Sequence, residues 1–293
     1  MASLFQIFLN SLFLIGVLSL STLGITLTYK TASVANFAQG ITATVGAFTA
    51  AFMLVRGGFN PWVAGLGGIL ICFVIGGAVD FLVVSRLKSG PVGRVMVTLG
   101  LILIITAFLP EIFGTIPYNF PRFFDGNFNF TLFGTNFTMT RNGLFIFITA
   151  LAVIAIVFLA LYKTKWGLMV RATASNSVVA SMLGINTKRL TAISWAVSSA
   201  VAALAAVLLG SQTTNVNVDM LAVVGTNSLL ALVVGGYTSF YGPVVGAVLI
   251  PTLLAMLAMI SGLWANVLLY IVVLLVILIK PMGLFGEKTM DKI

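Results

Sequence analysis

The side chains that carry most enzyme chemistry are scarce in this sequence. Its 293 residues include no histidine, six acidic residues spread along the chain, and a single cysteine, Cys72, within an apolar run. A metal site needs several His, Cys or carboxylate ligands, and a nucleophile–base triad needs a histidine or an equivalent base. The phosphate-binding pattern GxxxxGK[ST] is also absent. We therefore expect no enzyme and no metal or other cofactor in this chain.

Polar residues inside long apolar segments are the other candidates for a functional role. A polar group within a membrane must find partners there, so it is costly unless it has a role. A path for a solute is one such role. The candidate path residues are Asn36, Phe37, Gln39, Gly40, Asn227 and Ser228.

Two interpretations stay open for VANFAQG, residues 34–40. Asn36 can cap the helix that follows. Alternatively, Gln39 and its neighbours line an inner path. Replacement of Gln39 by Leu separates a path residue, which would lose transport but not assembly, from a structural one.

Asp80 is the one carboxylate that lies well within an apolar segment. It lies one to two helical turns from Arg86 and Lys88, so we expect a charge pair at the membrane surface. Transport driven by an ion gradient usually depends on buried carboxylates at mid-membrane. The missing carboxylate pair argues against an ion-driven transporter, which stays an alternative.

Composition places these residues in a membrane protein. The chain is 60% hydrophobic and 7% charged, with a mean hydropathy of +1.17, whereas a soluble protein has about 25% charged residues. Apolar segments of about 20 residues, enough to cross a bilayer, recur throughout. We predict an all-α, multi-pass membrane protein with one domain, 1–293, and about nine spans (eight to ten). The predicted spans are 3–29, 31–54, 61–85, 94–112, 143–162, 190–210, 221–236, 244–262 and 264–280.

The basic residues predict the orientation. They gather in 86–94, 163–189 and 280–292, which the positive-inside rule places in the cytoplasm. The net charge of +9 therefore reflects orientation signals, and no nucleic-acid partner is expected. The N-terminus and loops 113–142 and 211–220 then lie outside and the C-terminus inside. Spans 94–112 and 221–236 are short enough to be tilted, broken or re-entrant.

The two long loops have different sequence patterns. Residues 127–140 of the external loop alternate polar and apolar about Gly134-Thr135, which predicts a β-hairpin. It would cap the helix ends or form a docking surface for an external partner. In the cytoplasmic loop 163–190, Ser175 and Asn176 suit a helix N-cap and Gly184 a C′ position, so a short helix is predicted over 177–183. That helix is either a surface connector or a lever for a partner's movement.

Four stretches together resemble a known family. They are NFAQG (36–40), GLMVRATASNSVVASMLGINTKRL (167–190), GGYTSFYGPVVGAVLI (235–250) and KPMGLFG (280–286). In this order and spacing they resemble permease subunits of ABC importers of the branched-chain amino acid class. The resemblance covers nearly the whole chain except the external loop.

The resemblance implies a function and an assembly. The chain would be a membrane permease subunit in the cell (inner) membrane, forming half of the path for branched-chain or other hydrophobic amino acids. Its partners would be a homologous second permease subunit, two cytoplasmic ATPase subunits that bind ATP and Mg, an external substrate-binding protein and the lipid bilayer. Relatives also move urea and short amides, so these substrates stay an alternative.

The resemblance also assigns roles to residues. The helix after Arg171 would dock in a groove of the ATPase, and many relatives carry an acidic residue just before it where this chain has Ser175, Asn176 and Ser177. The positions assigned to coupling are Arg171, Ala172, Ser175, Ala180, Gly184, Ile185 and Asn186. A group of small residues lies between two predicted spans, where it would allow close helix packing and a tight reversal of the chain. The alternative is that these residues belong to a broken helix that lines the path. The positions concerned are Gly235, Gly236, Gly242, Pro243 and Gly246.

Overall fold

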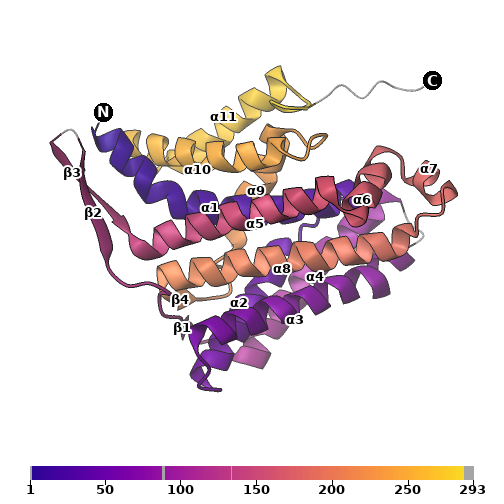
Figure 1. Ribbon diagram of the computed structural model, residues 1–293, viewed down its shortest axis with the longest axis horizontal. Helices are drawn as coiled ribbons and strands as arrows, with labels where there is room; N and C mark the ends of the chain where they lie inside the picture. Colours follow the sequence, from indigo (N-terminus) through magenta and orange to yellow (C-terminus); the bar gives the residue numbers. More distant parts are fainter. Residues whose placement is uncertain (1, 88–89, 133, 287–293) are drawn as a thin grey trace.

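Helices that lie side by side form almost the whole molecule (Figure 1). The computed structural model describes residues 2–87, 90–132 and 134–286, so Lys88, Lys288 and Lys292 of the basic clusters lie outside the described residues. The main helices of the described part are α1 (Ala2–Ala32), α2 (Gln39–Val55), α3 (Pro61–Leu82), α4 (Pro91–Phe113), α5 (Arg141–Lys163), α8 (Thr187–Thr213), α9 (Ala222–Gly235), α10 (Gly242–Ile260) and α11 (Ala265–Ile279). The shorter elements are η1 (Val84–Arg86), α6 (Lys165–Ser175), α7 (Ser177–Met182), β1 (Tyr118–Asn119), β2 (Asn127–Leu132), β3 (Thr135–Thr140) and β4 (Asn215–Val216).

Helix length separates the main helices into two groups. Within the described ranges, six are long and apolar enough to cross a membrane, namely α1, α3, α4, α5, α8 and α10. The apolar helices α2, α9 and α11 have 17, 14 and 15 residues, and at about 1.5 Å per residue α9 spans about 21 Å, less than a hydrocarbon core of about 30 Å. The chain is a multi-pass membrane protein. A count of nine full crossings stays a prediction.

Most predicted spans differ from the helices by a few residues at their ends, and three differences concern the start or the length of a helix. The predicted span 31–54 is wrong at its start, because α1 continues to Ala32 and α2 begins only at Gln39. The predicted span 94–112 is part of a 23-residue helix, α4, and is long enough to cross. Residues 187–189 belong to α8, which therefore begins three residues before the predicted 190.

The ends of the helices define two opposite faces of the molecule. The hairpin face contains the start of α1 and strands β1 to β4: β1 pairs with β4, and Gln6 exchanges two hydrogen bonds with the backbone of Thr138. The coupling-loop face contains the end of α1, α6, α7 and residues 236–241 and 280–286. There Lys30 Nζ donates to Thr238 O, and the N–H groups of Leu284 and Phe285 donate to the end of α9. These faces lie at opposite ends of the bundle (Figure 1).

The predicted β-hairpin is present in the structure. Strands β2 and β3 are antiparallel, with Asn127 opposite Thr140 and Leu132 opposite Thr135. Thr135 thus belongs to a strand and not to the turn, where Gly134 has φ +76°. On one side of β3, Phe137 and Met139 are buried against the first turns of α1. This contact explains the alternating pattern, because the apolar side chains of β3 face α1.

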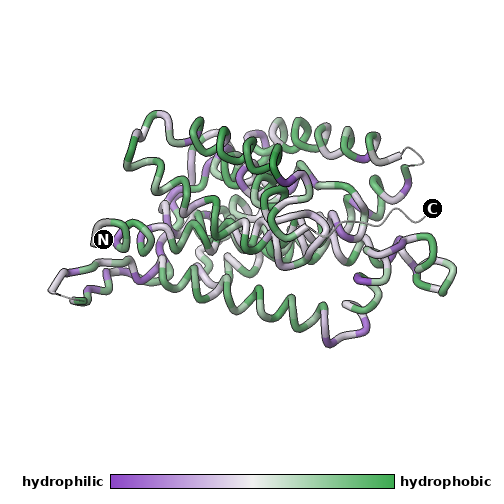
Figure 2. The backbone as a smooth tube through the Cα atoms, turned by 90° about the horizontal axis from the view of Figure 1, so that it is seen from above, coloured by the Kyte–Doolittle hydropathy of each residue, from purple (hydrophilic) through white to green (hydrophobic). Residues whose placement is uncertain are grey.

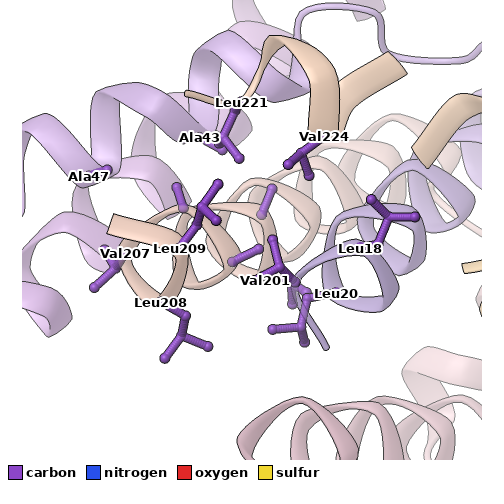
Figure 3. Close-up of a cluster of buried hydrophobic side chains, with 14 of the residues drawn as sticks. Leu18, Leu20, Ala43, Ala47, Val201, Val207, Leu208, Leu209, Leu221 and Val224 are labelled. Atoms are coloured by element: carbon purple, nitrogen blue, oxygen red, sulfur yellow. The ribbon is translucent and has the colours of Figure 1, made fainter. Parts of the chain in front are cut away.

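Helix α8 lies in the centre of the core. Its small buried residues allow α1, α2 and α3 to approach closely, as expected for helices in lipid. Figure 3 shows side chains of α1, α2, α8 and α9 gathered in one cluster. Helices at the periphery are predominantly hydrophobic (Figure 2), and α4 exposes Leu103 and Phe108 by 74% and 60%. Such faces suit contact with lipid.

Candidate functional site

Residues 33–38 carry the chain back into the bundle between α1 and α2. Ser33 has φ 55° just after α1 ends, and the turn closes where Asn36 Oδ1 accepts a hydrogen bond from the Ala38 N–H, 3.1 Å away. Ala38 occupies the N-cap position of α2 and its side chain caps nothing. Asn36, 3% exposed, therefore stabilises the turn before α2 instead of capping the helix as one interpretation predicted.

Gln39 fixes the start of α2 deep within the bundle. Its Nε2 donates to Ser21 O (3.0 Å), and its Oε1 lies 3.0 Å from Ser198 Oγ, which also lies 2.7 Å from Gly24 O. Ser21 lies 11 residues before Ala32, the end of α1, and Ser198 lies 11 residues after Thr187, the start of α8. At about 1.5 Å per residue, Gln39 is about 17 Å from the coupling-loop face, roughly half of a membrane core. Helix α2 therefore begins well inside the bundle and not beside the end of α1, where the predicted span 31–54 starts.

The first turn of α9 approaches the start of α2 at the same depth. A Cβ added to Gly40 would lie 3.1 Å from Leu221 O and 3.7 Å from Gly225 Cα. Helix α2 extends from this point to one face and α9 to the other (Figure 1). Two helices shorter than the neighbouring long helices thus have their N-terminal ends side by side within the bundle.

A cavity of about 340 Å³ lies beside these two helix ends. Helix α2 contributes one wall, the start of α9 a second, and Ile102 and Thr106 of α4 a third. Ile102 lies 11 residues after Pro91, the start of α4, which agrees with the depth of Gln39. Asp219 lines the side toward the hairpin face and is the one charged residue around the cavity within the described part of the chain.

The predicted path residues fall into two groups in the structure. Phe37 and Gly40 line the cavity. The others are buried and do not line it: Asn36, Gln39, Asn227 and Ser228. Ser228 Oγ donates to Val224 O within α9, whereas Asn227 Oδ1 has no hydrogen-bond partner among the described residues.

Sequence reasoning missed the polar groups of this cavity, Thr44, Thr106, Asp219 and Thr226. Asp219 was assigned only to an outer loop. The available signal was the length of 221–236, because a segment too short to cross a bilayer implies a chain end inside it.

Asp80 has different partners from those that its sequence neighbours indicated. It is 1% exposed, and its Oδ2 accepts from Ser85 Oγ (2.7 Å) and Thr191 Oγ1 (3.0 Å). Arg86 lies over the ring of Phe81 instead. The expected pair with Arg86 is therefore wrong, and Lys88 lies outside the described residues. Asp80 joins the end of α3 to the start of α8.

The short helix α7 is defined by capping groups at both of its ends. Asn176 Oδ1 accepts from the N–H groups of Val178 (3.0 Å) and Val179 (3.1 Å). At the other end Gly184 has φ +86°, and the N–H groups of Gly184 and Ile185 donate to Ser181 O and Ala180 O. This is a Schellman motif. The predicted caps and bounds of the helix therefore agree with the structure to within one residue.

The residues assigned to coupling surround α7. Ala172 O accepts from the Asn176 N–H, Ser175 ends α6, and Asn186 caps α8 by accepting from the Arg189 N–H. Arg171 lies 5.1 Å from the ring centre of Tyr162. On α7 itself Ala180 is buried, whereas Val178 and Met182 are 62% and 80% exposed. The helix therefore presents apolar side chains away from the molecule.

The glycines between α9 and α10 lie against backbone atoms. A Cβ on Gly235 or Gly242 would overlap the other residue's backbone, and one on Gly246 would overlap Ala231 O. Gly236 has φ +100° after α9, and Pro243 occupies the first turn of α10. Leu284 and Phe285 cover this turn through hydrogen bonds to Val234 O and Gly235 O. Close packing accounts for these residues.

Within the described ranges, no three His, Cys, Asp or Glu residues lie close enough together to hold a metal ion. The arrangement provides instead a mostly apolar cavity with a few polar groups beside the starts of α2 and α9, and an exposed apolar helix at the coupling-loop face.

Comparison with known proteins identifies relatives along the chain. Residues 7–278 match the family described as the permease component of branched-chain amino acid transport systems. The chain is 33% identical over 207 residues to a probable branched-chain amino acid transport permease protein LivH of Methanocaldococcus jannaschii, covering 66% of this chain and 62% of that protein's length. It is 25% identical over 289 residues to the high-affinity LivH permease of Salmonella typhimurium, covering 94% and 93% of the two chains. No solved structure matches.

Proposed function

The chain belongs to the family of permease components of branched-chain amino acid transport systems, and from this premise we propose that it forms half of the translocation path of an ATP-driven importer. Its cargo is a branched-chain or other hydrophobic amino acid, delivered by a substrate-binding protein. The match over residues 7–278 carries this proposal. The relatives named above are themselves described as branched-chain amino acid permeases.

The cavity beside α2 and α9 is the proposed part of the path. Half-helices whose N-terminal ends meet near mid-membrane are a recurrent way to build a solute site in transporters. Phe37 and Gly40 form its wall, and Gln39 holds α2 relative to α1 and α8. Asn227, whose Oδ1 has no partner among the described residues, and Ser228 join the path when α9 moves.

The exposed helix α7 is the proposed contact with the ATPase. Its apolar residues Val178 and Met182 dock in a groove of that subunit, and Arg171 and Asn186 hold the flanking helices. The coupling-loop face is then cytoplasmic and the hairpin face external, as the basic residues indicate. ATP and Mg bind to two ATPase subunits, and a second permease subunit completes the path in the cell (inner) membrane.

Co-purification with reconstitution tests the proposal. From native membranes we expect an ATPase, a second permease and a binding protein to purify with this chain, and leucine uptake into liposomes to require ATP. Gly184→Ala strains a residue with φ +86° and should uncouple ATP hydrolysis from leucine. The matched control is Gly262→Ala, where an added Cβ meets no atom within 4 Å. Absence of an ATPase, with hydrolysis unaffected by Gly184→Ala, would overturn the proposal.

A further inference from the structure

Resting on the function proposed above, we propose that the cavity between α2, α4 and α9 is a transient site for a zwitterionic amino acid, whose ammonium group binds the Asp219 carboxylate while its carboxylate faces the first turn of α2. The site would hold the solute partway across the membrane, after the binding protein has released it. Its specificity would then belong to this chain as well as to the binding protein.

The Asp219 carboxylate is available for a cationic group. The side chain is exposed and lines the cavity, and within the described residues it makes no hydrogen bond or ion pair. Its backbone carbonyl accepts from the Ala222 N–H (3.0 Å), which holds the residue immediately before α9. A carboxylate in this position, at the edge of a low-dielectric region, attracts an ammonium group.

Hydroxyl groups reinforce this preference for a donor. Thr44 and Thr226 line the cavity, and the hydroxyl of each donates its proton to a carbonyl of its own helix at 3.0 Å, to Gly40 O and Ala222 O respectively. Because those protons are committed, the remaining capacity of both oxygens is to accept hydrogen bonds. An ammonium group, with three donors and no acceptor, matches them.

The carboxylate group of the solute would have separate partners, at the start of α2. Gly40 and Ile41 line the cavity, and their N–H groups meet no acceptor among the residues that the structure describes. Unpaired N–H groups in the first turn of a helix, with the helix dipole, favour a carboxylate. Gly40 has no side chain to cover them, and Leu221 O and Gly225 already occupy the space where a Cβ would project.

Apolar walls complete the preference for an aliphatic amino acid. Ile41, Ile102, Leu221 and Leu229 line the rest of the cavity. Its volume of about 340 Å³ lies at the small end of the usual range for ligand pockets. A zwitterion with a short apolar side chain fits the charges, the hydroxyl groups and the walls together.

Charge variants of the reconstituted complex test the inference, with radioactive L-leucine as the probe. Asp219→Asn should lower ATP-dependent leucine uptake by about tenfold or more, because a charge-assisted contact is lost. Asp219→Glu should stay within about threefold of wild type, since it keeps the charge. Asp125→Asn removes an exposed carboxylate of the same face that does not line the cavity and should leave uptake unchanged.

A labelling experiment keeps the inference testable if Asp219→Asn fails to assemble. In a Cys72→Ala background, leucine supplied with the binding protein and ATP should slow maleimide labelling of Thr226→Cys severalfold. Val223→Cys, on the exposed side of the same helix and outside the cavity, should label at an unchanged rate. Equal rates with and without leucine at Thr226→Cys overturn the inference.

The outcomes separate this inference from the proposed function. A wild-type complex that takes up no leucine overturns the proposed function and the inference with it. Normal wild-type uptake that Asp219→Asn leaves intact overturns the inference alone. Selective loss in Asp219→Asn, with normal assembly and normal Asp125→Asn, supports both.

Discussion

The side-chain amide of Gln39 donates a hydrogen bond to the backbone carbonyl of Ser21 across 3.0 Å, about 17 Å from the coupling-loop face of the helix bundle. Ser198 of α8 lies 3.0 Å from the other end of the same amide. Three helices therefore meet at one buried polar side chain, 1% exposed. This contact determines where α2 begins, and with it the position of the cavity beside α9.

Replacement of Gln39 by Leu should lower the free energy of unfolding by about 1–3 kcal/mol, because the Ser21 carbonyl of α1 and the Ser198 hydroxyl of α8 each lose a buried hydrogen-bond partner. SDS titration of the purified subunit measures this. The matched control is Gln6→Leu, which removes two hydrogen bonds to Thr138 at the surface and should cost less. Normal stability with loss of leucine uptake would contradict the positioning role and favour the path role for Gln39.

Gly24→Ala should displace the Gln39 side chain. A Cβ at Gly24 would overlap Gln39 Nε2 and lie 3.0 Å from Ser198 O, so α1 and α8 must separate or the amide must leave its partners. We expect a lower midpoint in SDS titration and reduced uptake. Gly100→Ala, in α4, meets no atom within 4 Å and should retain the wild-type midpoint. Equal midpoints for the two variants would show that the contact is dispensable.

Local chemistry predicted the elements whose signals lie within a few residues. The alternation of 127–140 predicted the hairpin, and Asn176 with Gly184 predicted α7, because capping and turn formation depend on adjacent groups. The helix α6 had a comparable signal that was not used: Thr164 accepts from the Gly167 N–H and caps it. Composition alone was sufficient for the membrane class.

Long-range contacts determined what the sequence could not predict. Residues 33–38 contain no glycine or proline to mark a helix end, and the break there depends on partners in α1 and α8. Asp80 was paired with the cations nearest in sequence, whereas one of its hydrogen bonds comes from Thr191, 111 residues away. Asp219 lines the cavity only because α2 and α9 meet there.

Asn176→Ala should loosen α7 without affecting the bundle. It removes two hydrogen bonds from the Val178 and Val179 N–H groups, which is expected to destabilise this short helix by about 0.5–2 kcal/mol. Hydrogen exchange of residues 177–183 should become faster, and leucine-stimulated ATP hydrolysis of the complex should fall severalfold. Asn176→Asp keeps a capping oxygen and should retain both properties. Faster exchange with unchanged ATP hydrolysis would separate α7 from coupling.

Thr191→Val should weaken the junction between α3 and α8. The substitution keeps the shape of the side chain but removes the Thr191 hydroxyl, which lies 3.0 Å from Asp80 Oδ2. Among the described residues, the buried Asp80 carboxylate then keeps Ser85 as its hydrogen-bond donor. Loss of one donor to a buried charged group is expected to cost about 1–3 kcal/mol, read as a lower SDS midpoint. The matched control is Thr187→Val, whose side chain lines the same 380 Å³ cavity as Asp80 without a hydrogen bond to it, and it should retain the wild-type midpoint.

The double variant Asp80→Leu/Thr191→Val removes both the charge and its donor, so it should be more stable than the sum of its single changes predicts. Additive losses would mean that Thr191 and Asp80 act independently at this junction.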